Sequence, residues 1–147
     1  MTNRSGRTIS ARALTPGQAS GPVLVLDEPV SFWGGVNPET GELIDTHHPQ
    51  RGVRINGCIL LLPGGRGSSS SSSVFAECIR NKVAPAALLL GSADPILALG
   101  SLVASEVYGI STPVVVLEPG AYDKCCAATR LSLEADDELA VIQLDPE

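Results

Sequence analysis

Three short apolar runs constrain the fold of this sequence more than any other feature. They span residues 58–62, 86–90 and 113–117, and each has the length of a buried strand rather than of a helix. Helix-type patterns at residues 74–82 and 96–108 separate them. Because parallel strands need a crossover connection, this alternation predicts a parallel centre. Continuous apolar runs also fit strands that are buried on both faces.

Further strand candidates flank this centre on both sides. They are residues 7–14, 23–26, 131–133 and 139–144. Flanking strands at both ends predict either a mixed sheet or a second sheet. We therefore expect a single α/β domain over residues 1–147, with a mixed, largely parallel central sheet.

Composition narrows the classes of partner. The chain has 147 residues, of which 44% are hydrophobic, so it can bury a core of its own. Ten basic and 16 acidic residues give a net charge of −6, which argues against nucleic-acid and anionic-membrane partners. No apolar run approaches the roughly 20 residues of a membrane span. We expect neither a nucleic acid nor a membrane as partner.

The four cysteines do not form a recognisable metal motif. Cys58, Cys78, Cys125 and Cys126 contain no Cys-x-x-Cys pair and no histidine at a zinc-type offset. We expect buried free thiols and no metal or other cofactor held by this chain. Unpaired thiols suit a reducing compartment, and residues 1–12 are polar, so the expected location is the cytoplasm.

A glycine- and serine-rich turn joins the first apolar run to the first helix. It reads Gly64-Gly65-Arg66-Gly67-Ser68-Ser69. The free N–H groups at a helix start and the helix dipole favour anions. Arg66 adds a planar donor fork, Gly67 allows close backbone approach, and the hydroxyl groups of Ser68 and Ser69 add donors. The turn has neither the lysine of a P-loop nor the pattern of a nucleophile elbow. A solvated, serine-capped helix start is the alternative interpretation.

Residues 28–51 predict a long loop with several polar and aromatic groups. They include Ser31, Trp33, Asp45 and His48, and they show little apolar periodicity. Such loops are often functional, so we expect this segment to close over a substrate or a partner. A surface flap with Trp33 plugged into the core is the alternative. The adjacent pair His47-His48 points to opposite sides of an extended chain, which disfavours a metal site.

Two motifs in this order resemble the aconitase X family. The first runs over residues 27–41 and continues to Asp45 and His48-Pro49, and the second is residues 63–69. The resemblance covers residues 6–116. It implies a swivelling β/β/α domain like the mobile domain of aconitase. It also implies that this chain is the small subunit of a two-subunit dehydratase (hydro-lyase).

The resemblance assigns roles to residues of this chain. Ser68 is the expected proton acceptor, and Arg66, Gly67 and Ser69 are expected to bind substrate. A separate large catalytic subunit is expected to hold an iron–sulfur cluster or iron, with the flap facing that partner. Family members act on phosphomevalonate and on cis-3-hydroxy-L-proline. Arg66, the serine run and residues 47–50 look more like the hydroxyproline branch.

The chemistry favours a site that is shared between two chains. Elimination of water from a hydroxy acid needs a base beside the carboxylate and a Lewis acid for the hydroxide. Lowering a serine pKa costs about 1.4 kcal/mol per unit. A helix N-terminus supplies about 0.3–2 kcal/mol of this. The chain alone is therefore expected to be inactive. A non-enzymatic anion-binding or docking module, a histidine phosphocarrier and a lone acid-binding regulator remain alternatives.

Overall fold

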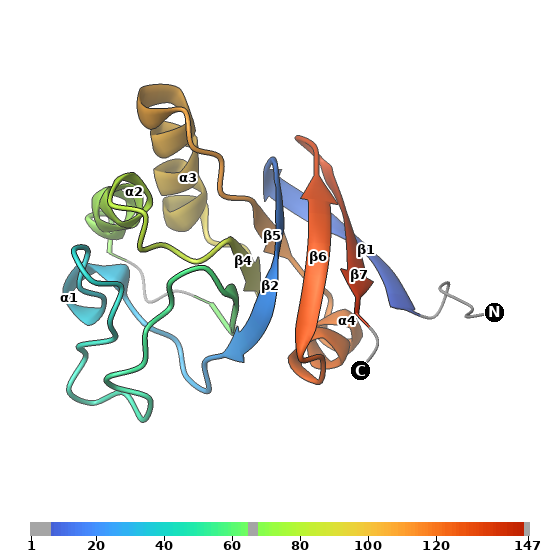
Figure 1. The fold of residues 1–147 in the computed structure, drawn as a ribbon, viewed down its shortest axis with the longest axis horizontal. Helices are drawn as coiled ribbons and strands as arrows, with labels where there is room; N and C mark the ends of the chain where they lie inside the picture. Colours follow the sequence, from blue (N-terminus) through green and yellow to red (C-terminus); the bar gives the residue numbers. More distant parts are fainter. Residues whose placement is uncertain (1–6, 65–67, 146–147) are drawn as a thin grey trace.

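The computed structural model describes residues 7–64 and 68–145, and their seven strands form a closed barrel (Figure 1). The strands are β1 (Thr8–Thr15), β2 (Gly17–Val25), β3 (Ile59–Leu62), β4 (Ala87–Leu90), β5 (Val114–Val116), β6 (Arg130–Ala135) and β7 (Leu139–Leu144). Their order around the barrel is β1-β5-β4-β3-β2-β6-β7, and β7 closes onto β1. The described part of the chain thus has a strand at each predicted place.

The sheet is mixed with a parallel centre, as the sequence predicts. Strands β2, β3, β4 and β5 are neighbours in parallel register, whereas the pairs that involve β1, β6 and β7 are antiparallel. The expected strand at residues 23–26 is the end of a longer strand. The first part of β2 pairs with β6 and carries small and polar residues, so it gives no apolar run.

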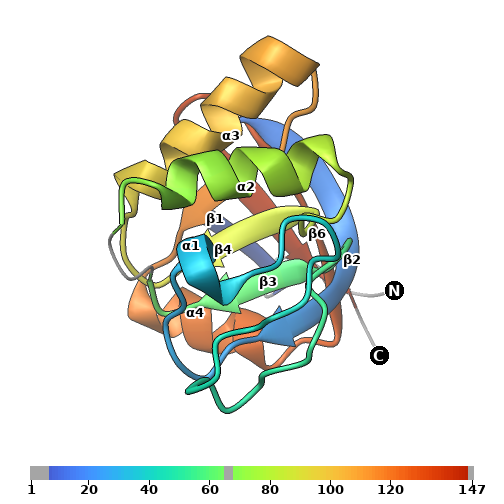
Figure 2. The same ribbon diagram turned by 90° about the vertical axis from the view of Figure 1, so that its left-hand side faces the viewer.

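Four helices are formed by the described residues. They are α1 (Phe32–Gly35), α2 (Ser71–Arg80), α3 (Pro95–Tyr108) and α4 (Pro119–Cys126). Helix α3 begins where the side chain of Asp94 accepts hydrogen bonds from two backbone N–H groups, and it ends at Gly109 in the left-handed region (φ 70°). Figure 2 shows α2 and α3 side by side over the parallel strands. None of these helices is long and apolar enough to cross a membrane.

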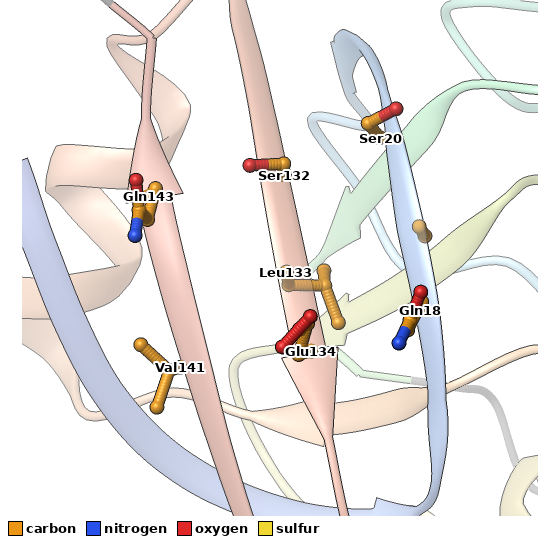
Figure 3. A pocket seen from close by; sticks show the side chains of 8 residues that line it. Gln18, Ser20, Ser132, Leu133, Glu134, Val141 and Gln143 are labelled. Carbon is orange, nitrogen blue, oxygen red and sulfur yellow. The ribbon is translucent and has the colours of Figure 1, made fainter.

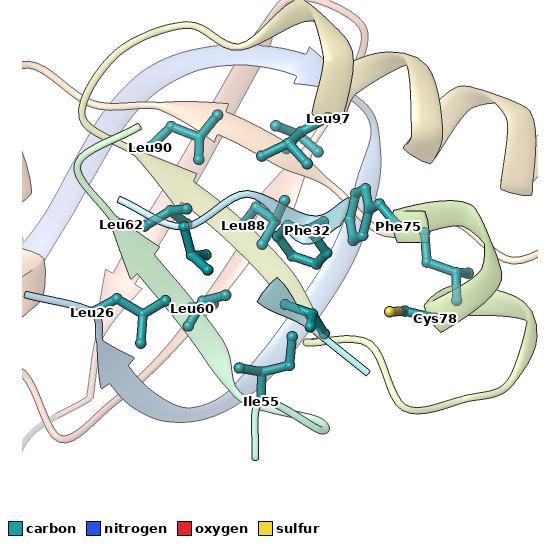
Figure 4. Close-up of a cluster of buried hydrophobic side chains, with 14 of the residues drawn as sticks. Leu26, Phe32, Ile55, Leu60, Leu62, Phe75, Cys78, Leu88, Leu90 and Leu97 are labelled. Atoms are coloured by element: carbon teal, nitrogen blue, oxygen red, sulfur yellow. The ribbon is translucent and has the colours of Figure 1, made fainter. Parts of the chain in front are cut away.

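Alternate residues of the parallel strands face two different cores. Leu60, Leu62, Leu88 and Leu90 pack against α2, α3 and the flap (Figure 4). Their neighbours in sequence, such as Leu61, fill the interior of the barrel. Every residue of β3 and β4 is therefore buried, which explains their continuous apolar runs.

The cysteines are free thiols, as expected. Cys58, Cys78 and Cys125 are buried and Cys126 is half-buried. Burial raises the pKa of Cys58 and of Cys78 to about 12, because the thiolate loses its hydration. These thiols pack as small apolar side chains rather than as nucleophiles.

The flap (residues 28–51), together with the residues that flank it out to 26 and 57, is a packed segment rather than an open loop. Three side chains of this segment, Val36, Leu43 and Ile55, are almost fully buried. Isolated β-bridges pair Val36 with Leu43 and Glu42 with Arg54. The predicted irregular segment is confirmed, but the chain folds back on itself around these three apolar side chains.

Candidate functional site at the carboxyl ends of the parallel strands

The glycine–serine turn leaves the carboxyl end of β3 and leads into α2. Because β2, β3 and β4 are parallel, the segments that follow them meet at one end of the barrel. Gly64 is buried there, and a Cβ atom at this position would lie 2.8 Å from the hydroxyl oxygen of Ser92, which follows β4. The turn after β3 therefore packs directly on the turn after β4.

Ser68 and Ser69 lie at the start of α2, as predicted. Ser68 is half-buried and Ser69 is exposed. The backbone carbonyl of Ser68 accepts a hydrogen bond from the backbone N–H of Ser71 at 2.9 Å. Ser70 occupies the N-cap position without a side-chain cap bond. The first N–H groups of the helix are instead paired with the backbone carbonyl groups of Ser68 and Ser69. The expected substrate-binding residues Arg66 and Gly67 lie outside the described residues.

The flap meets α2 through Ser31, Phe32 and Trp33. The hydroxyl oxygen atoms of Ser31 and Ser71 are 3.1 Å apart, and the backbone N–H of Trp33 donates to Ser71 Oγ at 3.1 Å. The ring of Phe32 packs on that of Phe75 with centroids 5.2 Å apart. Trp33 is 60% exposed, so the alternative of Trp33 plugged into the core is wrong; Phe32 takes that place.

Asp45 and His48 make hydrogen bonds to the backbone within the flap. An oxygen of the Asp45 carboxylate accepts the backbone N–H of His47, in a local turn. The His48 ring is buried, and its Nδ1 accepts the backbone N–H of Gln50. Nε2 therefore carries the proton and donates to the carbonyl of Glu28 at 3.0 Å. With both ring nitrogen atoms engaged, His48 is poorly suited to carry a phosphoryl group.

Gln50 and Ser71 are structural residues that the sequence analysis did not single out. The side-chain amide of Gln50 bonds the backbone N–H of Asp27 and the carbonyl of Val25, each at 2.8 Å, and so fixes the flap to the end of β2. Ser71 is 3% exposed within the serine run. A repeated serine carries no pattern that would distinguish it from its neighbours.

No cluster of three or more metal-ligating side chains occurs within residues 7–64 and 68–145. The two buried thiols with a pKa near 12 are also poor thiolate donors. The described residues do not fit an iron–sulfur cluster.

A shallow groove of about 580 Å³ lies elsewhere, on β2, β6 and β7 (Figure 3). Its polar side chains include Gln18, Ser20, Ser132, Glu134 and Gln143. The residues that line it from β2 belong to the beginning of that strand, whereas the glycine–serine turn follows the end of its parallel neighbour. The groove is therefore separate from the site around Ser68.

Comparisons with known proteins identify close relatives. The model of the aconitase X swivel domain family matches residues 8–141. A cis-3-hydroxy-L-proline dehydratase of Pseudomonas aeruginosa is 50% identical over 109 residues, 74% of this chain and 19% of that protein. A phosphomevalonate dehydratase small subunit of Methanothermobacter thermautotrophicus is 46% identical over 96 residues, 65% of this chain and 73% of that subunit.

The fold agrees with a solved structure. The crystal structure of Thermococcus kodakaraensis aconitase X in its holo-form superimposes with a TM-score of 0.77 at 32% identity, and 95% of this chain and 98% of that chain are covered. The match to the hydroxyproline dehydratases of Pseudomonas aeruginosa and Hypocrea jecorina spans about a fifth of their length.

Proposed function

Because this chain belongs to the aconitase X swivel domain family, we propose that it is the swivelling part of a dehydratase for a small hydroxy acid. Residues 1–147 would act as one swivelling domain, the small subunit of a two-subunit hydro-lyase. Relatives that are 50% and 46% identical are named as dehydratases, which supports this reaction class.

The observation that carries the proposal is the position of Ser68. Its side chain is half-buried, lies at the N-terminal end of α2, and makes no hydrogen bond to another described residue. A hydroxyl beside the positive end of a helix can take up a proton through its oxygen once it is ionised. Ser68 is therefore the proposed proton acceptor.

The neighbours of Ser68 would bind the acid. Arg66, Gly67 and Ser69 are the proposed substrate-binding residues, with the Arg66 guanidinium matching a carboxylate. Ser31 and Trp33 reach the same helix start from the flap. The exposed indole of Trp33 would cover the substrate or meet the partner. Asp45 and His48 would support this face from within the flap.

A large catalytic subunit is the proposed partner. It would hold the iron–sulfur cluster or iron, and a relative that is named as a small subunit supports such a partner. Ser68 is partly exposed, and water weakens the stabilisation that the helix dipole can give to its ionised form. The partner would exclude that water, so this chain alone would be inactive. The proposed location is the cytoplasm, which suits its four free thiols.

Cis-3-hydroxy-L-proline is the proposed substrate. The 50% identity to the Pseudomonas enzyme supports it. Phosphomevalonate is the second candidate, because this chain matches 73% of the length of a separate small subunit named for that reaction. Both molecules present a carboxylate to the same turn.

The test combines this chain with a large subunit of aconitase X type and measures dehydration of both acids. Ser68→Ala is expected to lower turnover about 10²- to 10⁴-fold, the usual contribution of a general base. Ser73→Ala, an exposed serine of the same helix, is the matched control. Full activity of Ser68→Ala, or activity of this chain without the partner, would refute the assignment.

A further inference from the structure

We propose that Ser71 is a positioning residue that holds Trp33 of the flap against the turn that carries Ser68. This inference rests on the proposed function, since Ser68 and Trp33 are residues of that site. It assigns a role to a buried hydroxyl that belongs to neither of the two motifs.

Ser71 is hydrogen-bonded both to Ser68 and to Trp33. Its backbone N–H donates to the carbonyl oxygen of Ser68 at 2.9 Å. Its Oγ accepts the backbone N–H of Trp33 at 3.1 Å. One residue therefore connects the proposed base with the flap tryptophan. The Ser71 side chain is thus a direct link between the start of α2 and the backbone of Trp33.

Ser71 Oγ has a partner both as an acceptor and as a donor. Because Oγ accepts from Trp33, its own proton is available for the Ser31 hydroxyl, 3.1 Å away. Ser71 is 3% exposed, so water does not compete for these bonds. Alanine at position 71 would leave the N–H of Trp33 without this acceptor.

Packing fixes the flap beside Ser71 but leaves the indole free. Phe32 and Phe75 are both buried and their rings are in contact, so α1 stays attached to α2 without Ser71 (Figure 4). The chain leaves helical geometry at Trp33, whose ψ is 117°, and the indole is 60% exposed. Ser71 thus orders the backbone of a side chain that stays accessible to a ligand or partner.

The experiment compares Ser71→Ala with Ser73→Ala in the full chain. Trp33 is the single tryptophan, so its fluorescence anisotropy reports on the flap directly. We expect lower anisotropy and about three- to tenfold faster hydrogen exchange at the Trp33 amide in Ser71→Ala, the range for one lost hydrogen bond. Amide exchange in β3 and β4 should stay unchanged. Ser31→Ala, which keeps the Trp33 bond, should have a smaller effect.

Turnover with the large subunit completes the test. Ser71→Ala should lower kcat at least threefold relative to Ser73→Ala. Unchanged exchange at Trp33, or faster exchange throughout β3 and β4, would overturn the positioning role. Faster local exchange with unchanged kcat would also overturn it. If the wild-type pair dehydrates neither acid, the proposed function fails, and the exchange comparison still decides whether Ser71 holds Trp33.

Discussion

The substitution Thr15→Val tests whether a side-chain hydroxyl completes the sheet where β1 meets β5. The register of this pair shifts between Ala13 and Thr15. At the shift, Thr15 Oγ1 accepts the backbone N–H of Val114 at 2.9 Å, in place of a backbone carbonyl. The same oxygen lies 3.0 Å from Ser101 Oγ of α3 and 3.3 Å from the carbonyl of Thr112. One hydroxyl therefore connects two strands and a helix.

The burial of Thr15 sets the loss of stability that we expect from Thr15→Val. Thr15 is 1% exposed, so water cannot replace the lost oxygen. Valine preserves the shape but leaves the Val114 N–H unpaired, which costs about 1–3 kcal/mol. A chain of this size loses roughly 2–4 °C of Tm for each kcal/mol. We therefore expect Thr15→Val to lower Tm by about 2–12 °C.

Chemical and thermal unfolding followed by circular dichroism would measure the effect. Thr15→Ser keeps the hydroxyl and should be less destabilising than Thr15→Val. Thr46→Val, at an exposed position, is the control. If Thr15→Val unfolds with the wild-type midpoint, or if serine is as destabilising as valine, the hydroxyl does not stabilise the strand pair.

Three further predictions concern buried residues. The raised pKa values of Cys58 and Cys78 keep these thiols neutral in the folded state, so a thiol reagent at pH 8 should modify the half-buried Cys126 first. Unfolded thiols ionise from their ordinary value of 9.0, so stability should fall as pH rises from 9 towards 12. Gly100→Ala would place a Cβ atom 2.6 Å from the backbone carbonyl oxygen of Ser72 and 3.2 Å from the Phe75 side chain, where α3 packs on α2, and should cost about 1–3 kcal/mol.

The predictions on thiol labelling and on Gly100→Ala can each be contradicted by a simple measurement. Rapid labelling of Cys58 or Cys78 in the native protein would show that these thiols are not protected by burial. Gly120→Ala is the matched control for Gly100→Ala, because its Cβ atom would meet nothing within 4 Å. Equal unfolding midpoints for these two variants would contradict the proposed close packing of α2 and α3.

The parallel centre was predictable from sequence because both faces of β3 and β4 are buried. Burial on both sides forces apolar residues at successive positions, and this pattern is visible without any partner strand. The first part of β2 gave no such signal. It forms the barrel wall with Ala19 and Gly21 opposite β6, and small residues there have neither clear alternation nor β propensity.

The site was predictable only where residue type carries the chemistry. The turn around Ser68 stood out because glycine, arginine and serine suit anion binding at a helix start. Ser71 did not, since its burial depends on the phase of α2 within a run of identical residues. The exposure of Trp33 was equally hidden, because Phe32 beside it is just as apolar and takes the buried position.

Closure of the barrel has a consequence for assembly. Each of the seven described strands has a hydrogen-bonded neighbour on both sides, so the sheet offers no free backbone edge among these residues. An incoming protein cannot dock on this sheet by β-augmentation, the mode in which an added strand extends it. Recognition by the described residues would instead use side chains. Such contacts can be released and re-formed without breaking main-chain pairing, as the proposed swivelling movement would require.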